Sequence, residues 1–278
     1  MVLRGSNTNH NDISFIYGGI AGVFSRTIVS PLDRIKILMQ ITKNNNDSFI
    51  QVMKQTIRQE KITSLWKGNI LNCMRVFPYS SIQFATYDYC KKYSSIETEN
   101  ITIYNRLFFG IIAGSTATTI THPMDVIRHR LMCYSHINSL KHSIKDLYLE
   151  NGLRSYFKGY GSTLVSLTPF IAINFSVYDQ LKTQLNVDKN NPIDILTLGA
   201  ISAIISQGIC YPLDTIRRRM QLSGNNYKNG LDVLVQIVKK EGIPKLYSGM
   251  IPNMLKIVPN NSIRFGVYEL LKQTLTKG

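Results

Sequence analysis

Charged side chains recur in one spacing at three places in this sequence. Each place reads Pro-x-Asp-x-x followed by Lys or Arg, and the copies occupy residues 31–36, 123–128 and 212–217. The prolines are 92 and 89 residues apart, so the period is close to 90 residues. One such hexamer occurs by chance and is typical of a helix start, but its recurrence at one spacing indicates a repeated unit that carries a carboxylate and a cation each time.

Two further landmarks keep this period. Glycines close the segments Leu-Trp-Lys-Gly, Tyr-Phe-Lys-Gly and Leu-Tyr-Ser-Gly at Gly68, Gly159 and Gly249, with offsets of 91 and 90 residues. An aromatic residue followed by an acid, and then by a lysine, recurs with the same offsets. These triplets are Tyr87, Asp88 and Lys91; Tyr178, Asp179 and Lys182; and Tyr268, Glu269 and Lys272. The matched landmarks predict three tandem copies of one unit.

Each unit contains two long segments with helical character. The first is apolar, rich in small residues, and predicted to continue beyond a bend at its proline. These first segments are 13–30, 103–122 and 193–211. Charged amphipathic stretches such as 49–60 and 231–241 should then lie along a membrane surface. The second long segments are 69–92, 161–185 and 252–275. Because these carry polar residues such as Arg75, Gln83 and Arg264, they must face water or one another.

We therefore predict an all-α membrane protein with six transmembrane helices, arranged as three two-helix repeats with pseudo-threefold symmetry around a central cavity. The mean hydropathy is only −0.04, as expected when each helix has one apolar face and one face toward a wet cavity. The predicted division is a short polar N-terminus at 1–12 and repeats at 13–95, 101–187 and 192–275.

The chain is strongly basic, with 32 Lys and Arg against 17 Asp and Glu and a net charge of +15. Such an excess indicates a polyanionic partner: nucleic acid, anionic lipid or phosphorylated small molecules. Because the cations recur along the whole chain rather than on one helix or tail, we expect no nucleic acid partner. The four cysteines form no CxxC pair, so neither a metal site nor a disulfide framework is expected.

The repeated motifs resemble those of the mitochondrial carrier family from about Ser14 to Lys272. That family carries Pro-x-acid-x-x-basic on each odd helix, then acid-Gly-x4-aromatic-basic-Gly, then aromatic-acid-x-x-basic at the end of each even helix. The middle element departs here in three loop positions: Lys61 replaces its glycine, Asn151 its acid and Ser248 its basic residue.

The resemblance implies two charge networks that close the cavity from opposite sides. On the matrix side, Asp33, Asp125 and Asp214 would pair with Arg128, Arg217 and Lys36, each acid meeting the base of another repeat. Gln40 and Gln221 stand where the family places a glutamine brace, and Met132 stands there in the second repeat. On the cytoplasmic side, the acids and lysines of the three aromatic triplets would pair between neighbouring even helices.

Substrate specificity should lie where the repeats differ. At equivalent places in the even helices stand Arg75, Ser166 and Lys256. Together with Arg26, the two cations are predicted to bind phosphates. The segments around Arg75 and at 217–221 resemble carriers of adenine nucleotides and coenzyme A. Where nucleotide carriers have a slot for adenine, this chain has Ser166 and Leu167.

These likenesses imply an ADP/ATP-type antiporter that works by alternating access. It would reside in the inner membrane of a mitochondrion or of a mitochondrion-derived organelle such as a mitosome. Coenzyme A, another adenosine phosphate and thiamine pyrophosphate remain alternative substrates, and a soluble helical repeat scaffold is the alternative of a different class. No enzymatic activity, cofactor or metal is expected. A monomer with an anionic, cardiolipin-like lipid as partner is expected.

Overall fold

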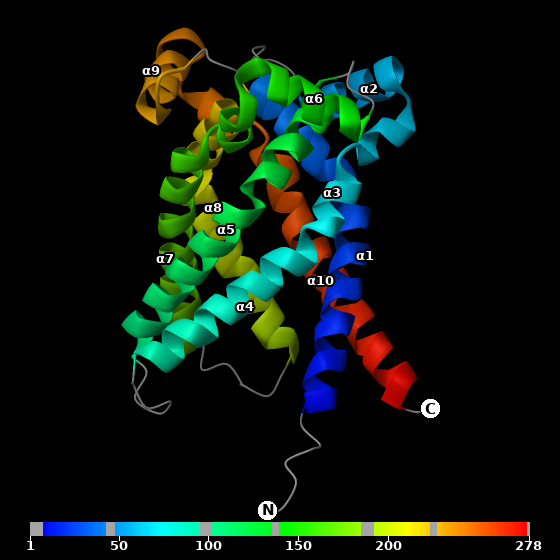
Figure 1. The fold of residues 1–278 in the computed structure, drawn as a ribbon, viewed down its shortest axis with the longest axis vertical. Helices are drawn as coiled ribbons and strands as arrows, with labels where there is room; N and C mark the ends of the chain where they lie inside the picture. The colour runs from blue at the N-terminus through cyan, green and yellow to red at the C-terminus, as the bar shows by residue number, and fades with distance from the viewer. Residues whose placement is uncertain are drawn as a thin grey trace, which may run out of the picture.

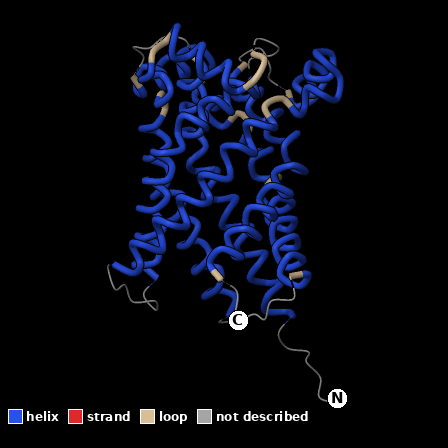
Figure 2. The backbone as a smooth tube through the Cα atoms, turned by 90° about the vertical axis from the view of Figure 1, so that its left-hand side faces the viewer, coloured by secondary structure: helices blue, strands red, loops and turns tan. Residues whose placement is uncertain are grey.

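The computed structural model describes residues 8–42, 48–94, 102–134, 139–184, 192–222 and 227–276. These ranges are helical with short connections and contain no strand (Figure 2). The first repeat comprises α1 (Thr8–Ile41), α2 (Phe49–Glu60), the 3₁₀ turn η1 (Ile62–Trp66), α3 (Asn69–Met74) and α4 (Val76–Tyr93). The second comprises α5 (Ile103–Cys133), α6 (Leu140–Asn151), η2 (Gly152–Phe157) and α7 (Tyr160–Gln184). The third comprises α8 (Pro192–Leu222), α9 (Gly230–Lys240), η3 (Ile243–Tyr247) and α10 (Met250–Thr276).

The long helices form a closed ring in which the second helix of one repeat packs on the first helix of the next. The pairs are α4 with α5, α7 with α8, and α10 with α1. The short helices α2, α6 and α9 lie together across one end, at the top of Figure 1. We call this the short-helix end. The predicted all-α fold with three repeats is confirmed.

The odd helices run through their prolines, with Pro31 inside α1, Pro123 inside α5 and Pro212 inside α8. Two details differ from prediction. Helix α1 already begins at Thr8, within the segment expected to be a short polar N-terminus. The second helix of the first repeat is interrupted at Arg75 between α3 and α4, three residues before Pro78, which has no N–H to donate to the preceding turn.

Three small apolar cores join each short helix to its odd helix. Ile35, Val52 and Leu65 connect α1, α2 and η1. The second core includes Val126 and Leu147, and the third includes Ile216 and Val233. The start of α2 is fixed by a capping box in which the Ser48 hydroxyl accepts from the Gln51 N–H at 3.4 Å and the Gln51 side chain accepts from the Ser48 N–H at 2.7 Å.

Glycine is required where each even helix begins. Gly68, Gly159 and Gly249 have φ of 78°, 68° and 82°, a left-handed conformation that other residues adopt only with strain. Each glycine also packs closely against the odd helix of another repeat. A side chain at Gly249 would lie 2.8 Å from the Lys36 carbonyl oxygen, and one at Gly159 would lie 3.0 Å from the Gln221 nitrogen. The glycines therefore permit close packing between repeats beside the charged motifs.

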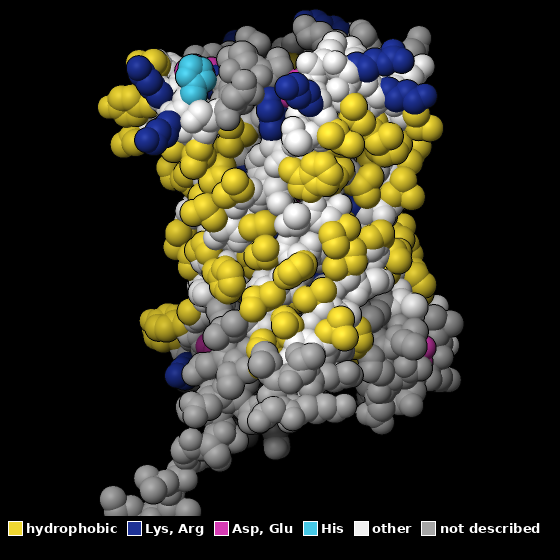
Figure 3. Space-filling model, turned by 90° about the vertical axis from the view of Figure 1, so that its right-hand side faces the viewer, with side chains coloured by type: hydrophobic (Ala, Val, Ile, Leu, Met, Phe, Trp, Pro, Cys, Tyr) yellow, Lys and Arg dark blue, Asp and Glu magenta, His cyan; other side chains and the backbone are white. Residues whose placement is uncertain are grey.

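Apolar side chains cover the middle of the bundle as a broad band, and Lys and Arg gather near the short-helix end (Figure 3). Phe24, Ile28, Ile120 and Val165 are among the large apolar side chains left exposed. By length and composition alone, one described stretch, Leu140–Gln184, is apolar enough to cross a membrane. The other long helices carry cavity-facing polar groups, which lower their mean hydropathy.

Candidate functional site

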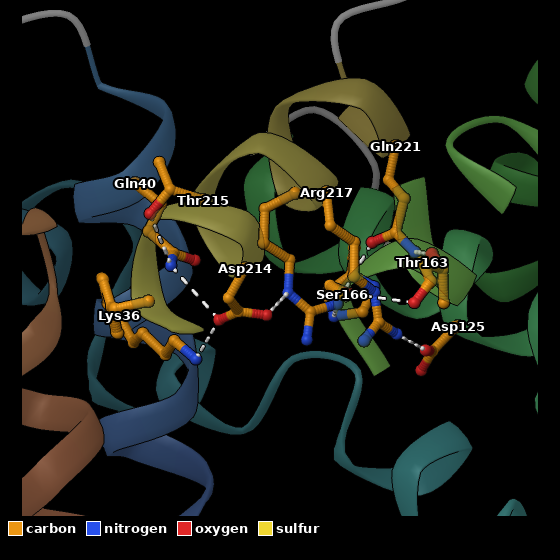
Figure 4. Close-up of polar contacts among 12 residues, drawn as sticks. Lys36, Gln40, Asp125, Thr163, Ser166, Asp214, Thr215, Arg217 and Gln221 are labelled. Atoms are coloured by element: carbon orange, nitrogen blue, oxygen red, sulfur yellow. Dashed lines mark hydrogen bonds and ion pairs between the residues drawn. The ribbon is translucent and has the colours of Figure 1, made fainter. Parts of the chain in front are cut away.

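Three ion pairs tie the odd helices to one another below the short-helix end. Arg128 Nη2 lies 3.0 Å from Asp33 Oδ2, which joins α5 to α1. Arg217 Nη2 lies 2.8 Å from Asp125 Oδ2, which joins α8 to α5, and Lys36 Nζ lies 2.6 Å from Asp214 Oδ2, which joins α1 to α8. These are the partners that the family resemblance implies, and we refer to the six residues as the ion-pair ring. Figure 4 shows two of its pairs, Lys36 with Asp214 and Arg217 with Asp125.

Each acid of the ring also contacts a second cation. Lys256 Nζ on α10 lies 2.5 Å from Asp33 Oδ1, and Arg75 forms an ion pair with Asp125. Arg218, on the same helix as Asp214, places its Nε 3.6 Å from Asp214 Oδ1. Sequence reasoning assigned Arg75 and Lys256 to substrate and did not foresee that they contact the ring.

The two glutamines and the methionine that occupy equivalent positions have different surroundings. Gln40 Nε2 donates to Asp214 Oδ2 at 3.4 Å and to Thr215 Oγ1 at 3.3 Å (Figure 4). Gln221 Nε2 donates to Thr163 Oγ1 at 3.4 Å. Met132 instead packs with Ile37 and Leu222 in an apolar cluster with one member from each odd helix. The second repeat therefore exchanges a polar brace for apolar contact.

A polar cavity of about 340 Å³ lies against the ring. It is lined by Arg26, Asp33, Asn72, Arg128, Phe170, Ala203, Gln207, Lys256, Ile257, Asn260 and Asn261. The buried Asn72 side chain accepts a hydrogen bond from Arg26 Nη1 at 2.8 Å. This bond holds Arg26, one of the predicted phosphate-binding cations, in place. A second cavity of about 350 Å³, lined by Gly18, Asn261, Arg264, Phe265 and Tyr268, shares Asn261 with the first.

The predicted adenine slot does not line the polar cavity. Ser166 is buried and its hydroxyl donates to the Thr163 carbonyl at 2.9 Å, while Leu167 packs toward Gly114. Phe170, further along α7, lines the cavity together with Gln207 of α8. Their place in the cavity could not be predicted from the sequence, because neither residue belongs to a repeated motif.

The described side chains cover only part of the predicted cytoplasmic network. Asp88 and Asp179 are exposed and form no ion pair with Lys91 or Lys182 within those ranges. Tyr87 packs edge-on against Phe109, with ring centroids 6.2 Å apart, Tyr178 is partly buried, and Tyr268 lines the second cavity. The side chains of Glu269 and Lys272 lie outside the described residues. The two cytoplasmic pairs that involve Glu269 and Lys272 stay predictions.

An outer set of ion pairs fastens the short helices to the bundle. Arg34 and Lys67 each contact Glu60 at 2.8 Å. Burial alone would raise the pKa of Glu60, but hydrogen bonds from Lys67 and Arg34 outweigh it and hold that pKa below its ordinary value. In the third repeat, Arg219 contacts Glu241 at 2.5 Å.

The second repeat has the same fastening despite Asn151. Arg130 lies 2.5 Å and Lys158 lies 3.1 Å from Glu150, one residue before the expected acid. Burial opposes ionisation of Glu150, yet the hydrogen bonds from these two cations lower its pKa. Sequence reasoning missed this ring of outer acids because it looked only at the fixed motif position.

Three helix pairs around a polar cavity, with an apolar outer band and one end tied by ion pairs, define a membrane-embedded solute transporter. The chain belongs to the mitochondrial carrier family: the pattern described as "Mitochondrial carrier protein" matches residues 9–97, 99–189 and 188–278. Members of this family are transporters rather than enzymes. This membership excludes the soluble scaffold.

Several curated proteins are similar over nearly the whole chain. The chloroplastic thylakoid ADP,ATP carrier protein of Arabidopsis thaliana is 36% identical over 94% of this chain and 65% of its own length. The mitochondrial adenyl nucleotide antiporter of Homo sapiens is 35% identical over 93% of this chain and 57% of its own length. The mitochondrial adenine nucleotide transporter of Arabidopsis thaliana is 33% identical over 94% of this chain and 86% of its own length.

Proposed function

We propose that this protein exchanges adenine nucleotides of the ADP/ATP type across a membrane by alternating access. The observation that carries the proposal is that Arg26 and Lys256 line the polar cavity together with Asp33, while Arg75 forms an ion pair with Asp125 of the same ring. A phosphate chain offers these cations several oxygen acceptors, and guanidinium groups bind such oxygens in pairs. The names of the similar proteins, which carry adenine nucleotides, support the same substrate class.

Binding and opening are coupled through the shared cations. When phosphates engage Lys256 and Arg75, Asp33 and Asp125 each lose one of their two cationic partners. A hydrogen bond to a charged group contributes about 1.5–3 kcal/mol, so the loss of two such contacts loosens the ring without abolishing it. Substrate binding then favours the conformation in which the short-helix end opens and the cytoplasmic network forms.

The nucleobase is placed against Phe170 in this proposal, with the amides of Gln207, Asn260 and Asn261 as hydrogen-bonding partners. An aromatic ring beside several amides suits a planar heterocycle. A small dicarboxylate would need neither. Coenzyme A and other adenosine phosphates, which share the adenine ring, remain the second candidates, since the same cavity would accept their nucleotide portion.

Exchange in liposomes tests the substrate. Purified protein should exchange external ADP or ATP for internal nucleotide, measured beside AMP, coenzyme A and thiamine pyrophosphate, with and without a membrane potential. Transport of coenzyme A without any adenine nucleotide would contradict the nucleotide proposal. A dependence of ADP/ATP exchange on the potential would establish that it is electrogenic.

A matched pair of variants tests the site. Arg75→Ala should abolish uptake while the protein remains folded and inserted. Arg154→Ala, which removes an exposed cation on η2 that does not line the cavity, should retain uptake within about twofold, because exposed charges contribute little. Normal uptake by Arg75→Ala would remove Arg75 from the binding site.

The proposed setting is the inner membrane of a mitochondrion or mitochondrion-derived organelle, with an anionic, cardiolipin-like lipid bound. A cavity of about 580 Å³ beside the first turns of α7 and α9, with Lys228 among its lining residues, supports the lipid proposal, since helix N-termini attract phosphate. Native mass spectrometry should detect a cardiolipin adduct that weakens on Lys228→Glu. Fractionation of tagged protein would test the location.

A further inference from the structure

The proline inside each odd helix removes the hydrogen-bond donor of one backbone carbonyl. In an α-helix each N–H donates to the carbonyl four residues earlier, and proline has no N–H. In α1 the carbonyl that Pro31 leaves without this donor belongs to Thr27. Thr27 lies between the exposed apolar side chains of Phe24 and Ile28, where little water can take the place of the missing donor.

Trp66, the single tryptophan of the chain, supplies the donor in the first repeat. It is the last residue of η1, and its Nε1 donates to the Thr27 carbonyl oxygen at 2.9 Å. Two asparagines of α3 follow at intervals of three residues. Asn69 Nδ2 donates to the Thr27 hydroxyl at 3.0 Å, and Asn72 Oδ1 accepts from Arg26 Nη1 at 2.8 Å. We call Trp66, Asn69 and Asn72 the α1 clamp.

The third repeat fastens its bend in the opposite direction, with the donor on the odd helix. Tyr211 of α8 donates its hydroxyl hydrogen to the Ser248 carbonyl oxygen at 3.0 Å. The carbonyls four residues before the prolines of α5 and α8 belong to Thr119 and Gly208. Within the described ranges, no side chain donates to either of them. The bond from Trp66 therefore distinguishes the first repeat from the other two.

This difference coincides with the position of a cavity cation. Arg26 lines the polar cavity and immediately precedes Thr27. The equivalent residues of α5 and α8 are the uncharged Thr118 and Gln207. A binding group that is already held in its bound position loses less conformational freedom when the ligand arrives. The α1 clamp thus lies on the odd helix whose bend carries a cation toward the cavity.

We propose that Trp66 is a positioning residue for substrate binding, because its indole N–H fixes the turn of α1 that directs Arg26 toward the substrate phosphates. The proposal rests on the proposed function, which gives Arg26 a phosphate to bind. Trp66 is 40% exposed and is not among the residues that line the polar cavity. Its effect on substrate affinity is therefore transmitted through the backbone of α1.

Trp66→Phe removes the N–H and keeps an aromatic ring, as the second repeat has at Phe157. In the liposome exchange assay we expect the KM for ADP to rise about fivefold, the effect of one net hydrogen bond, while kcat stays within about twofold. Tyr247→Phe is the matched control at the equivalent position of the third repeat. It keeps the stacking on Tyr211 and should leave KM within about twofold. A lower kcat at unchanged KM for Trp66→Phe, or an equal rise in KM for Tyr247→Phe, would overturn the proposal.

A double variant shows whether Trp66 acts through Arg26. The affinity for ADP is read from the rise of the unfolding midpoint with ADP concentration, which requires no uptake. Arg26→Gln alone should weaken binding, and adding Trp66→Phe should weaken it no further, because the positioned guanidinium is already gone. Losses that multiply in the double variant would contradict the proposal, since Trp66 would then act on the cavity by another route.

Thermal unfolding without substrate tests the hydrogen bond itself. Pro31→Ala restores a backbone N–H four residues after Thr27, so this carbonyl regains its helical donor. Trp66→Phe should lower the midpoint by about 2–4 °C in the wild type and by less than about 1 °C in the Pro31→Ala protein. Equal losses in both backgrounds would count against the proposal. If no variant exchanges or binds nucleotide, the proposed function fails, and the midpoints still decide whether Trp66 stabilises this carbonyl.

Discussion

The contact between Lys256 and Asp33 offers the most direct test of whether a cation that pairs with the ion-pair ring also binds the substrate. Lys256 Nζ lies 2.5 Å from Asp33 Oδ1, while Arg128 holds the other carboxylate oxygen at 3.0 Å. The side chains of Lys256 and Asp33 are 25% and 14% exposed. A charge-assisted hydrogen bond contributes about 1.5–3 kcal/mol when buried, and partial exposure reduces this toward the lower limit. We expect a coupling energy of about 1–2 kcal/mol.

A double-mutant cycle with Lys256→Gln and Asp33→Asn measures that coupling. Thermal unfolding of the purified protein without substrate should show the double variant about 2–8 °C more stable than the sum of the single effects predicts. Asp214→Asn combined with Lys256→Gln is the control, because Asp214 is paired with Lys36 and Arg218 instead. That pair should be additive within about 0.5 kcal/mol.

ADP should diminish the coupling between Lys256 and Asp33, since the proposed phosphate ligand and the carboxylate compete for one ammonium group. Additive behaviour of Lys256→Gln and Asp33→Asn without substrate would refute the reasoning, because it would mean that the contact contributes nothing to the ring. Equal coupling in both cycles would refute it as well, by showing a general charge effect instead of a specific contact.

Three further predictions concern stability. Lys61, with φ of 78° and ψ of 160°, adopts a backbone conformation suited to glycine. Lys61→Gly should therefore raise the unfolding midpoint by about 2–4 °C. Gly242 has the equivalent conformation in the third repeat, and Gly242→Ala should lower the midpoint. Glu150 has a lowered pKa, so its contribution is present above the unfolded pKa and lost as pH falls through the folded value; Glu150→Gln should flatten the acid limb of a midpoint-versus-pH curve. Gly159→Ala should lower the midpoint because its methyl group would meet Gln221 at 3.0 Å, while Gly161→Ala, with open space, should not.

The repeat architecture was predictable because its signals are local and occur three times. A serine and a glutamine three residues apart define the start of α2, and glycine marks the start of each even helix where φ is positive. Hydropathy alone could not have predicted the bundle, because one described stretch passes as a membrane span. Cavity-facing polar groups lower the hydropathy of the other long helices, so the period of about 90 residues, rather than hydropathy, predicts where these helices lie.

The site was less predictable because it depends on how the helices are rotated and spaced. The repeated motif and its family resemblance suggested the pairs of the ring, but Lys256 and Asp33 are 223 residues apart and no motif links them. Glu150 replaces Asn151 from the adjacent position because Arg130 and Lys158 can reach it. Such substitutions by a neighbouring residue require knowledge of side-chain reach, which spacing alone does not give.

The three acids of the ring occupy the same position of the repeated motif, yet they differ in what can separate them from their cationic partners. The second cation of Asp33 is Lys256, which lines the polar cavity, and the second cation of Asp125 is Arg75. The second cation of Asp214 is Arg218, which lies on the same helix as Asp214 and contacts His129 and Gln221. A substrate can shift an equilibrium only as far as it binds the two states differently. Phosphates that engage Lys256 and Arg75 therefore act directly on the ion pairs of Asp33 and Asp125, but not on that of Asp214. The third ion pair must be opened by strain transmitted through the helices, which makes Asp214 the acid whose release sets the free-energy cost of opening after substrate is bound.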